Sequence, residues 1–373
     1  MEFPVHIHDV WISDPYVLTD PKTGLYYIYS RFFSRADFIP DEPGKFYAIC
    51  SKDLIHWSEP QVVFEQGDFW ADKDYWAPEC HIWHGKYYLV SSFRAEGTYR
   101  ACQFLVADHP LGPFKPVAPE PVTPKGWQCL DGTLFVDEAG KPWMVFCHEW
   151  VQVFDGQIAA IPLSDDLGRA IGEPIILFRA SEAPWRGPQL DQGVCDGGNV
   201  TDGPFLHRMQ DGTLIMLWSN YCKDGYAVGF AWSRSGGIRG PWVQDPTPIY
   251  AFDGGHAMFF HTFEGQLMMA LHCPNTFDKK RALFFEMEER NGRPCIINEV
   301  TGNWYDRMGG GGAKHHYDVP TTEQAHFRLG IGTQEVRIDE WGDAREAASL
   351  REAPPSRSHP KSGWRSGCAF LPT

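Results

Sequence analysis

The sequence predicts an all-β fold, a five-bladed β-propeller with four-stranded antiparallel blades. Five segments repeat one pattern, in which an apolar run, a Gly-containing turn and a second, aromatic- or Met-rich run follow one another. Two such runs joined by a turn are typical of a hairpin. No helical period of 3.6 residues persists along the chain. Hairpin units repeated in this way indicate blades set around a central channel. A β-sandwich or an irregular all-β fold is the alternative.

The repeated segments start between 53 and 71 residues apart, and a third apolar run follows each of them. In several repeats a short polar turn then leads toward a fourth strand, as in SEPQVVF and EPIILF. The hairpins are expected over 14–30, 77–92, 131–147, 202–219 and 255–272. The third runs lie within 45–57, 101–114, 156–168, 226–242 and 281–294.

The last part of the chain does not continue the repeats. We therefore expect a propeller domain over 1–318 and a weakly ordered, irregular C-terminal extension over 319–373, which is poor in strand patterns and ends in a stretch rich in Arg, Ser and Pro. The stretch MGGGGAKHHY from Met308 is expected to form a flexible connector. Adjacent residues of an extended chain point to opposite sides, so His315 and His316 are not expected to hold one metal ion.

Composition and charge exclude several kinds of partner. The chain has 373 residues, of which 43% are hydrophobic, and a formal net charge of −15. Nucleic acids and anionic membranes need basic patches, so neither is an expected partner. The start, MEFPVHIHDVW, lacks the pattern of a secretory signal, and the ten cysteines contain no CxxC pair. We expect a cytoplasmic protein with reduced thiols; the sequence does not indicate its oligomeric state.

Acidic residues stand near the start of several repeats. Asp14, Asp131 and Asp202 begin theirs, Glu79 lies two positions into the second, and His256 lies one position into the fifth. The first strand of each propeller blade lines the central channel, so these side chains are expected to meet at one mouth. A single Asp would be an ordinary turn residue. Three at equivalent places indicate a function, because like charges packed together cost stability.

Opposed carboxylates are suited to the cleavage of glycosidic bonds. One acid protonates the leaving oxygen while one base activates water, and a third carboxylate raises the pKa of the acid by repulsion. Aromatic side chains near these positions suit the faces of sugar rings, although each alone is more often part of a core. The candidates for substrate binding are Trp76, Glu79, Trp11, Phe33 and Trp150.

The phrases SDPYVL, YWAPE, LDGTLF and TDGPF, in this order and spacing, resemble glycoside hydrolase family 43 from about His8 to Ile297. The resemblance implies a five-bladed propeller that hydrolyses arabinose- or xylose-containing saccharides with inversion. It implies that Asp14 is the general base, that Asp131 orients the acid and modulates its pKa, and that Asp202 is the general acid. It also implies that no cofactor is required and that His256 helps to hold a structural Ca²⁺ or Na⁺ ion in the central channel through water.

The acid position departs from the family pattern. The family has EGP where this chain has DGP, and Asp is shorter by one methylene, which sets the carboxyl back by about 1.5 Å. Glu79 and Glu149 are the reserve proton donors. The departure also leaves open a related propeller family whose donor is not Glu, such as the α-neoagarooligosaccharide hydrolases, which look similar in their first blades.

These observations favour an inverting, exo-acting glycoside hydrolase that removes α-L-arabinofuranoside or β-D-xyloside residues from the ends of oligosaccharides. Long segments such as 30–44 and 178–199 are expected to build the rim of a pocket and restrict attack to chain ends. A carbohydrate-binding propeller without catalysis is the alternative. The pairs His6 and His8, and His81 and His84, have spacings seen in metal sites, but ordinary polar strand residues are the preferred interpretation.

Overall fold

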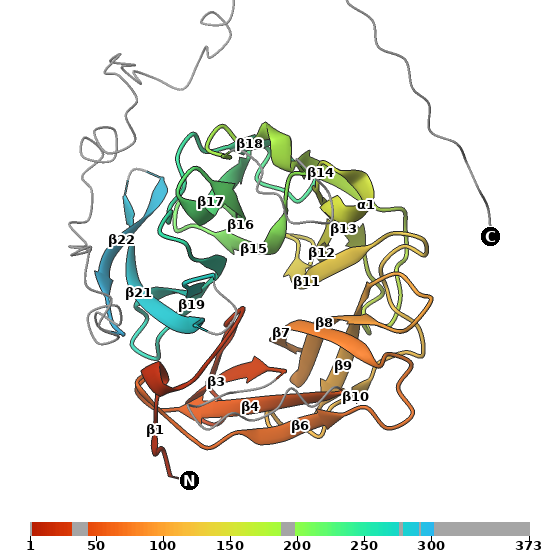
Figure 1. The fold of residues 1–373 in the computed structure, drawn as a ribbon, viewed down its shortest axis with the longest axis vertical. Helices are drawn as coiled ribbons and strands as arrows, with labels where there is room; N and C mark the ends of the chain where they lie inside the picture. The colour runs from red at the N-terminus through yellow and green to blue at the C-terminus, as the bar shows by residue number, and fades with distance from the viewer. Residues whose placement is uncertain (1, 32–43, 188–197, 276–278, 291, 302–373) are drawn as a thin grey trace, which may run out of the picture. The chain divides into compact units, whose positions relative to one another are not determined.

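The computed structural model describes residues 2–31, 44–187, 198–275, 279–290 and 292–301. The chain divides into two compact units, Met1–Val319 and Pro320–Thr373, and every described residue belongs to the first. In this unit five antiparallel sheets follow one another in a ring (Figure 1). The prediction of a five-bladed β-propeller is confirmed.

Each blade is built from strands in sequence order, with the first strand innermost (Figure 1). Blade 1 contains β2 (Val17–Asp20), β3 (Leu25–Ser30), β4 (Lys45–Ser51) and β6 (Gln61–Glu65), and the two-residue strands β1 (Val5–His6) and β5 (His56–Trp57) extend its sheet. Blade 2 contains β7 (Lys73–Trp83), β8 (Lys86–Arg94), β9 (Ala101–Ala107) and β10 (Lys115–Pro116). Blade 3 contains β11 (Cys129–Val136), β12 (Pro142–His148), β13 (Gln157–Pro162) and β14 (Ile175–Arg179).

Blade 4 contains β15 (Asp202–Arg208), β16 (Leu214–Cys222), β17 (Gly225–Ser233) and β18 (Trp242–Gln244). Blade 5 contains β19 (Gly255–His261), β20 (Leu267–Cys273), β21 (Arg281–Arg290) and β22 (Arg293–Glu299). Helical structure in the described residues is limited to one turn of α-helix, α1 (Trp150–Val153), and two 3₁₀ turns, Ile7–Asp9 and Ala180–Glu182.

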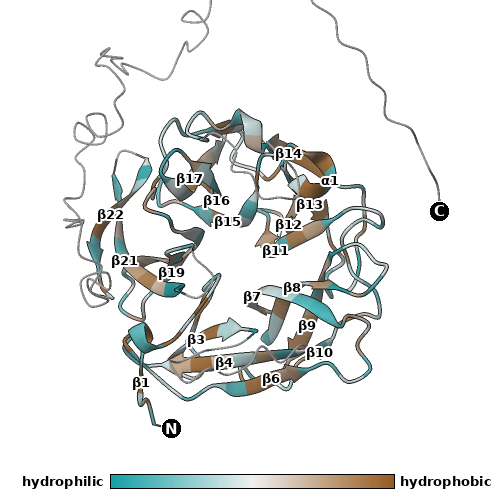
Figure 2. Ribbon diagram, viewed as in Figure 1, coloured by the Kyte–Doolittle hydropathy of each residue, from teal (hydrophilic) through white to brown (hydrophobic). Residues whose placement is uncertain are grey.

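The second strand of each blade is buried on both faces because each blade packs between two neighbours. In β12, Trp143, Val145 and Cys147 join the hydrophobic cluster shared with blade 4, whereas Met144 and Phe146 join the cluster shared with blade 2. Side chains of a strand alternate between its two faces, so one strand supplies both interfaces. The same alternation holds in β3, β8, β16 and β20, and hydrophobic residues recur along the strands of every blade (Figure 2).

The segment before blade 1 joins the first blade to the last. Val5 pairs with Trp57 of blade 1, while the N–H of Ile12 donates to the carbonyl oxygen of Lys280, which precedes β21. Arg281 of β21 donates from Nε to the carbonyl oxygen of His8 at 2.9 Å. The hydrophobic cluster between blades 1 and 5 includes four residues of this segment, Val5, Ile7, Val10 and Ile12. These contacts close the ring.

Some of the sequence-based predictions concern residues outside this part of the chain. The extension over 319–373, the connector from Met308, His315, His316 and Phe33 lie outside the described residues, so the domain boundary at 318 and the disorder of the extension stay predictions. Within the described ranges, no helix is long and apolar enough to cross a membrane. The eight cysteines in those ranges are all free thiols.

Matched isoleucines test the importance of the interfaces between blades. Ile158 of β13 is fully buried in the cluster between blades 3 and 4, and Ile171 lies on the surface with 57% of its area exposed. We expect Ile158→Ala to lower the free energy of unfolding by about 2–5 kcal/mol, because it leaves a cavity in a packed interface. Ile171→Ala should change it by less than about 0.5 kcal/mol. Urea unfolding followed by circular dichroism measures both, and equal losses would contradict this description of the core.

Candidate active site

A backbone irregularity at the start of the first strand of each blade positions the candidate site. Near these starts the chain enters the left-handed region, which residues other than Gly rarely adopt. In β7, β11, β15 and β19 the pairing register shifts at the same place, so the irregularity is a β-bulge. The positions and φ angles are Asp14 (53°), Ala77 (46°), Asp131 (53°), Gly203 (50°) and His256 (55°). Each blade therefore presents one equivalent position to the centre.

The structure corrects the alignment of the repeats in two blades. Asp202 was expected at the same place as Asp14 and Asp131, but it lies one residue before the bulge, and Gly203 occupies the equivalent position. In blade 5 the repeat was expected to start at Gly255, but His256, one residue later, occupies the equivalent position, whereas the second repeat starts at Ala77 as expected. The five equivalent positions thus carry two carboxylates, one imidazole and two small residues.

His256 joins the two carboxylates at the bulges. Its Nδ1 atom lies 3.3 Å from Oδ1 of Asp14 and 3.8 Å from Oδ2 of Asp131. The N–H of Gly203 donates to Oδ2 of Asp131 at 2.9 Å, which brings the backbone beside Asp202 to the same centre. The hydroxyl of Tyr226 donates to Oδ2 of Asp202 at 2.8 Å. Residues from blades 1, 3, 4 and 5 therefore converge, although up to 242 positions separate Asp14 from His256 in the sequence.

Gly203 leaves space for the imidazole of His256. A Cβ atom at position 203 would lie 2.8 Å from Cγ and Cδ2 of His256, which is closer than real contacts allow. The position also requires a φ of 50°. Glycine is therefore needed after Asp202 for two reasons, the backbone conformation and the room for the ring.

Side chains of the preceding blade hold the bulges in place. The N–H of Asp131 donates to Oγ of Ser92 at 2.9 Å, and the N–H of His256 donates to Oγ of Ser219 at 2.8 Å. The N–H of Asp14 lies 3.2 Å from Nδ1 of His272, which accepts in the neutral ring. All three partners lie on second strands, so each bond joins two neighbouring blades.

The environment of Asp14 favours its ionised form. Burial alone would raise the pKa of Asp14, but the charge of His256, the hydrogen bond with His272 and the charge of Lys280 together hold that pKa well below its usual value. Ser13 donates from Oγ to Oδ2 of Asp14 at 2.8 Å, and Nζ of Lys280 donates to Oγ of Ser13 at 3.2 Å. Asp14 therefore carries a negative charge at neutral pH.

The environments of Asp131 and Asp202 favour their protonated forms. Burial and the neighbouring charge of Asp14 raise the pKa of Asp131 well above its usual value, against the hydrogen bond from Gly203. Burial and the charge of Asp131 raise the pKa of Asp202 to about 7, against the hydrogen bond from Tyr226. The two carboxyls titrate as an interacting pair. Asp14 is therefore ionised, whereas the pair of Asp131 and Asp202 retains protons to a higher pH than ordinary carboxyls do.

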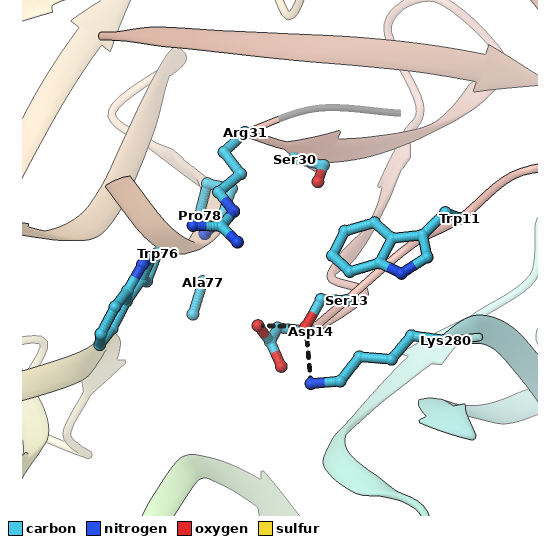
Figure 3. Close-up of a pocket in the computed structure, with 9 residues that line it drawn as sticks. All are labelled: Trp11, Ser13, Asp14, Ser30, Arg31, Trp76, Ala77, Pro78 and Lys280. Carbon is cyan, nitrogen blue, oxygen red and sulfur yellow. Dashed lines mark hydrogen bonds between the residues drawn. The ribbon is translucent and has the colours of Figure 1, made fainter. Parts of the chain in front are cut away.

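Asp14 lies at the wall of a cavity of about 180 Å³ with aromatic residues on two sides (Figure 3). Figure 3 shows Trp11 and Trp76 on opposite sides of Asp14, and Arg31 and Lys280 also point toward this space. The cavity is lined by Trp11, Ser13, Asp14, Ser30, Arg31, Trp76, Ala77, Pro78 and Lys280. Of the predicted substrate-binding residues that the structure describes, Trp11 and Trp76 are therefore placed together with Asp14.

The two remaining binding candidates that the structure describes, Glu79 and Trp150, are not part of the cavity lining. Glu79 is buried, and its Oε2 atom lies 3.1 Å from Nε2 of His81. Trp150 begins helix α1, and its ring lies against the backbone at Gly198, where a Cβ atom would approach the indole to 2.5 Å.

Sequence reasoning missed Lys280, Tyr226 and His272. Tyr226 stands on a third strand and Lys280 just before one, outside the repeated hairpins, and His272 is the last residue of the fifth hairpin, on a second strand. His272 could have been found from its place, because it opposes Gly255 in the register, directly beside the bulge at His256.

The residues around His256 do not fit a directly coordinated metal ion. Among the described residues, no group of three His, Cys, Asp or Glu side chains is arranged to hold one. The Nδ1 atom of His256 faces two carboxylates instead. The pairs His6 and His8, and His81 and His84, likewise form no such group. A central Ca²⁺ or Na⁺ ion that His256 holds through water stays a prediction.

The family model of glycosyl hydrolases family 43 matches residues 6–304, which include all five blades and the carboxylates described above. The chain belongs to glycoside hydrolase family 43. The resemblance found in the phrases of the first strands is thereby confirmed.

Curated relatives match parts of this family 43 chain. A region of 152 residues is 32% identical to the xylosidase/arabinosidase 43A of Humicola insolens and covers 40% of this chain and 39% of that protein. A region of 81 residues is 33% identical to a β-xylosidase of Xylanibacter ruminicola and covers 22% of this chain and 24% of that protein. The chain thus spans less than half of the length of these relatives.

Solved structures match the propeller more completely. The endo-arabinase of Bacteroides thetaiotaomicron superposes with a TM-score of 0.72 and 40% identity, covering 79% of this chain and all of that one. The α-L-arabinofuranosidase of Lactobacillus brevis has a TM-score of 0.62 at 18% identity, covering 78% of this chain and 95% of that one. The second likeness shows the fold alone.

The raised pKa of Asp202 predicts a pH-dependent effect on stability. The pKa of Asp202 is about 7 in the folded protein and about 3.9 in the unfolded chain. Its contribution to the free energy of unfolding is therefore fully present below pH 4 and is lost as the pH rises toward 7. Asp202→Asn removes the loss. We expect the free energy of unfolding of this variant to gain about 2 kcal/mol over the wild type between pH 4 and pH 8, allowing for partial exposure. Urea unfolding at both pH values measures it, and parallel curves would contradict the raised pKa.

Proposed function

We propose that this family 43 chain is an inverting, exo-acting glycoside hydrolase that removes α-L-arabinofuranoside or β-D-xyloside residues from oligosaccharides. The observation that carries the proposal is the contrast between the carboxyls at the centre of the propeller. The pKa of Asp14 lies well below its usual value, whereas burial and Asp131 raise that of Asp202 to about 7. An inverting enzyme needs one ionised base and one protonated acid at the same pH.

In this mechanism Asp14 accepts a proton from a water molecule, which attacks the anomeric carbon. The hydrogen bond from Ser13 holds the carboxylate in position, and the backbone N–H of Asp14 donates to Nδ1 of His272. Asp202 donates its proton to the departing glycosidic oxygen, and its contact with Tyr226 fixes the carboxyl group. Asp131 raises the pKa of the acid and, through the N–H of Gly203, positions the backbone that carries it. The water attacks the anomeric carbon from the face opposite to the departing oxygen, so the anomeric configuration inverts.

The contacts of the reserve acids favour Asp202 as the donor. Glu149 forms an ion pair with Arg100, which holds its carboxylate. Glu79 faces His81 and is 5% exposed. Asp202 has a carboxyl that interacts electrostatically with both Asp14 and Asp131. The shorter side chain is therefore proposed to work with a substrate that sits closer to the backbone of blade 4.

The named activities of the relatives support the substrate class. A xylosidase/arabinosidase and an endo-arabinase are among the proteins that this chain resembles. The indoles of Trp11 and Trp76 supply apolar walls for a sugar ring, and the small volume of the cavity favours a terminal residue over the middle of a chain. The endo-arabinase is 40% identical to this chain, so the experiment below distinguishes attack at chain ends from attack inside the chain.

An oligosaccharide is the only partner that this proposal requires. The proton transfers use side chains alone, so we propose no required cofactor, while an ion near His256 would act on structure and charge. The formal net charge of −15 opposes contact with nucleic acids or anionic membranes. The free cysteines among the described residues support a reducing compartment, and we propose the cytoplasm.

The proposal predicts that Asp14→Asn abolishes hydrolysis but retains binding. Nitrophenyl α-L-arabinofuranoside and β-D-xyloside are the substrates, and we expect kcat to fall by about 10³-fold or more because no base remains to activate water. Xylotriose and arabinotriose should still bind in calorimetry. Proton NMR of the wild-type reaction should show the inverted anomer first, and chromatography should show single sugars leaving the chain ends.

Other outcomes separate the alternatives. Binding of trisaccharides without hydrolysis by the wild type would indicate a carbohydrate-binding propeller. Full activity of Asp14→Asn would remove the assigned base, a retained anomer would exclude inversion, and internal cleavage products would replace exo by endo action.

The pKa values also predict the pH dependence of kcat/KM. Activity should rise as Asp14 loses its proton, below about pH 4, and fall near pH 7 as Asp202 loses its own. Tyr226→Phe removes a hydrogen bond that lowers the pKa of Asp202. The alkaline limb of this variant should therefore move upward by about half a unit to one unit. Tyr250→Phe is the control, since the Tyr250 hydroxyl faces Cys273. An unchanged limb in Tyr226→Phe would contradict the role of Asp202.

A further inference from the structure

We propose that Arg100 is a positioning residue that holds the indole of Trp76 as a wall of the sugar pocket. This inference rests on the proposed function, which makes the cavity a sugar pocket. Arg100 itself does not line that cavity. The guanidinium carbon of Arg100 lies 4.0 Å from the centroid of the Trp76 ring. Trp76 is drawn in Figure 3 as part of the cavity wall, whereas Arg100 is not among the residues that line the cavity, so the guanidinium packs on the indole from outside the cavity lining.

Two carboxylates fix the guanidinium from its edge. Arg100 donates from Nε and Nη2 to Oδ2 of Asp74, at 3.2 and 3.0 Å, and from Nη1 to Oε2 of Glu149. Its backbone N–H donates to Oε1 of Gln128 at 2.7 Å. Arg94 forms a second ion pair with Asp74. The two carboxylates are therefore balanced by two guanidinium groups. The plane of Arg100 is therefore set before any sugar arrives.

The arrangement costs too much to serve stability alone. The side chains of Arg100, Asp74 and Glu149 are each at most 10% exposed, and a buried ion network of this kind is often no more stable than apolar residues of the same size. Asp74 also adopts a φ of 58°, a strained conformation for a residue with a Cβ atom. Strain and desolvation in one place indicate a geometric role.

The network also connects the wall to a second blade. Trp76, Asp74 and Arg100 belong to blade 2, whereas Glu149 follows β12 of blade 3. The tilt of the indole is thus set across the interface between the blades and not by blade 2 alone. Glu149 thus accepts a hydrogen bond from Arg100 as part of this support. A carboxylate held in this way is not available as a proton donor to the substrate.

The stacking explains why Arg and not Lys occupies position 100. A planar guanidinium can lie flat on an indole while its edge donates to carboxylates, and an ammonium group cannot do both. Loss of the stack would free the ring without removing charge. Contact of a sugar with the indole exists in the ground state and the transition state alike, so the loss should raise KM and leave kcat.

A double-mutant cycle tests this inference. Arg100→Lys, Trp76→Ala and the double variant are compared with the wild type on the nitrophenyl glycoside that the enzyme cleaves. We expect Arg100→Lys to raise KM about tenfold while kcat stays within about threefold. In the Trp76→Ala background the same change should have no further effect on KM, because the ring through which it acts is gone. Arg239→Lys is the matched control, since Arg239 lies 5.3 Å from the ring of Trp143, outside the pocket, and should leave KM unchanged.

Independent, multiplicative effects of Arg100→Lys and Trp76→Ala on KM would overturn the inference, as would an unchanged KM in Arg100→Lys. A fall in kcat alone would also overturn it and assign Arg100 to the chemistry. If the wild type cleaves no saccharide, the proposed function fails, and the same cycle is read from dissociation constants of xylotriose or arabinotriose by calorimetry. If neither trisaccharide binds, the inference fails as well.

Discussion

The packing of each blade against two neighbours is the constraint on which the site depends. The second strands are buried on both faces, so their alternate side chains must match two different clusters at once. Apolar area buried in this way supplies the main driving force for the fold and leaves the polar ends of the first strands to meet at the centre. Bonds such as those from Asp131 to Ser92 and from His256 to Ser219 then fix the bulges relative to the neighbouring blade.

The electrostatics of the centre follow from this packing. Like carboxylates would disperse on a flexible chain, but the propeller holds Asp14 and Asp131 at the same nitrogen atom of one imidazole. The imidazole, Lys280 and His272 surround Asp14, while Asp131 and Asp202 have fewer positive neighbours. Identical side chains thereby acquire opposite protonation, which is the property that acid–base cleavage of a glycosidic bond needs.

Much of the fold and part of the site could be predicted from the sequence. The phrases that begin with Asp14 and Asp131 repeat the hairpin pattern, and apolar runs on either side of a Gly-containing turn made their strands recognisable. Asp202 was aligned one residue out, because a shared Asp is a weaker guide to register than the bulge that follows it. The hydrophobic pattern of the repeats indicates which strand carries a residue. It does not indicate which neighbouring blade the side chain of that residue contacts.

For that reason the supporting groups remained hidden. His272 acts across a blade interface, as does the ion pair of Arg100 with Glu149, and Tyr226 reaches Asp202 from the third strand of the same blade. Trp76 could be found from its place before the bulge, whereas the guanidinium behind it could not, since 24 positions separate them in the sequence.

The missing side chain at Gly203 has a consequence for how a repeat protein can acquire a catalytic centre. Five identical blades would present five identical groups at the axis, and the imidazole ring takes the room that one of them would need. Departure from rotational symmetry is therefore a steric requirement of this centre. A propeller assembled from copies of one blade could become such an enzyme only after its units had diverged at the axis.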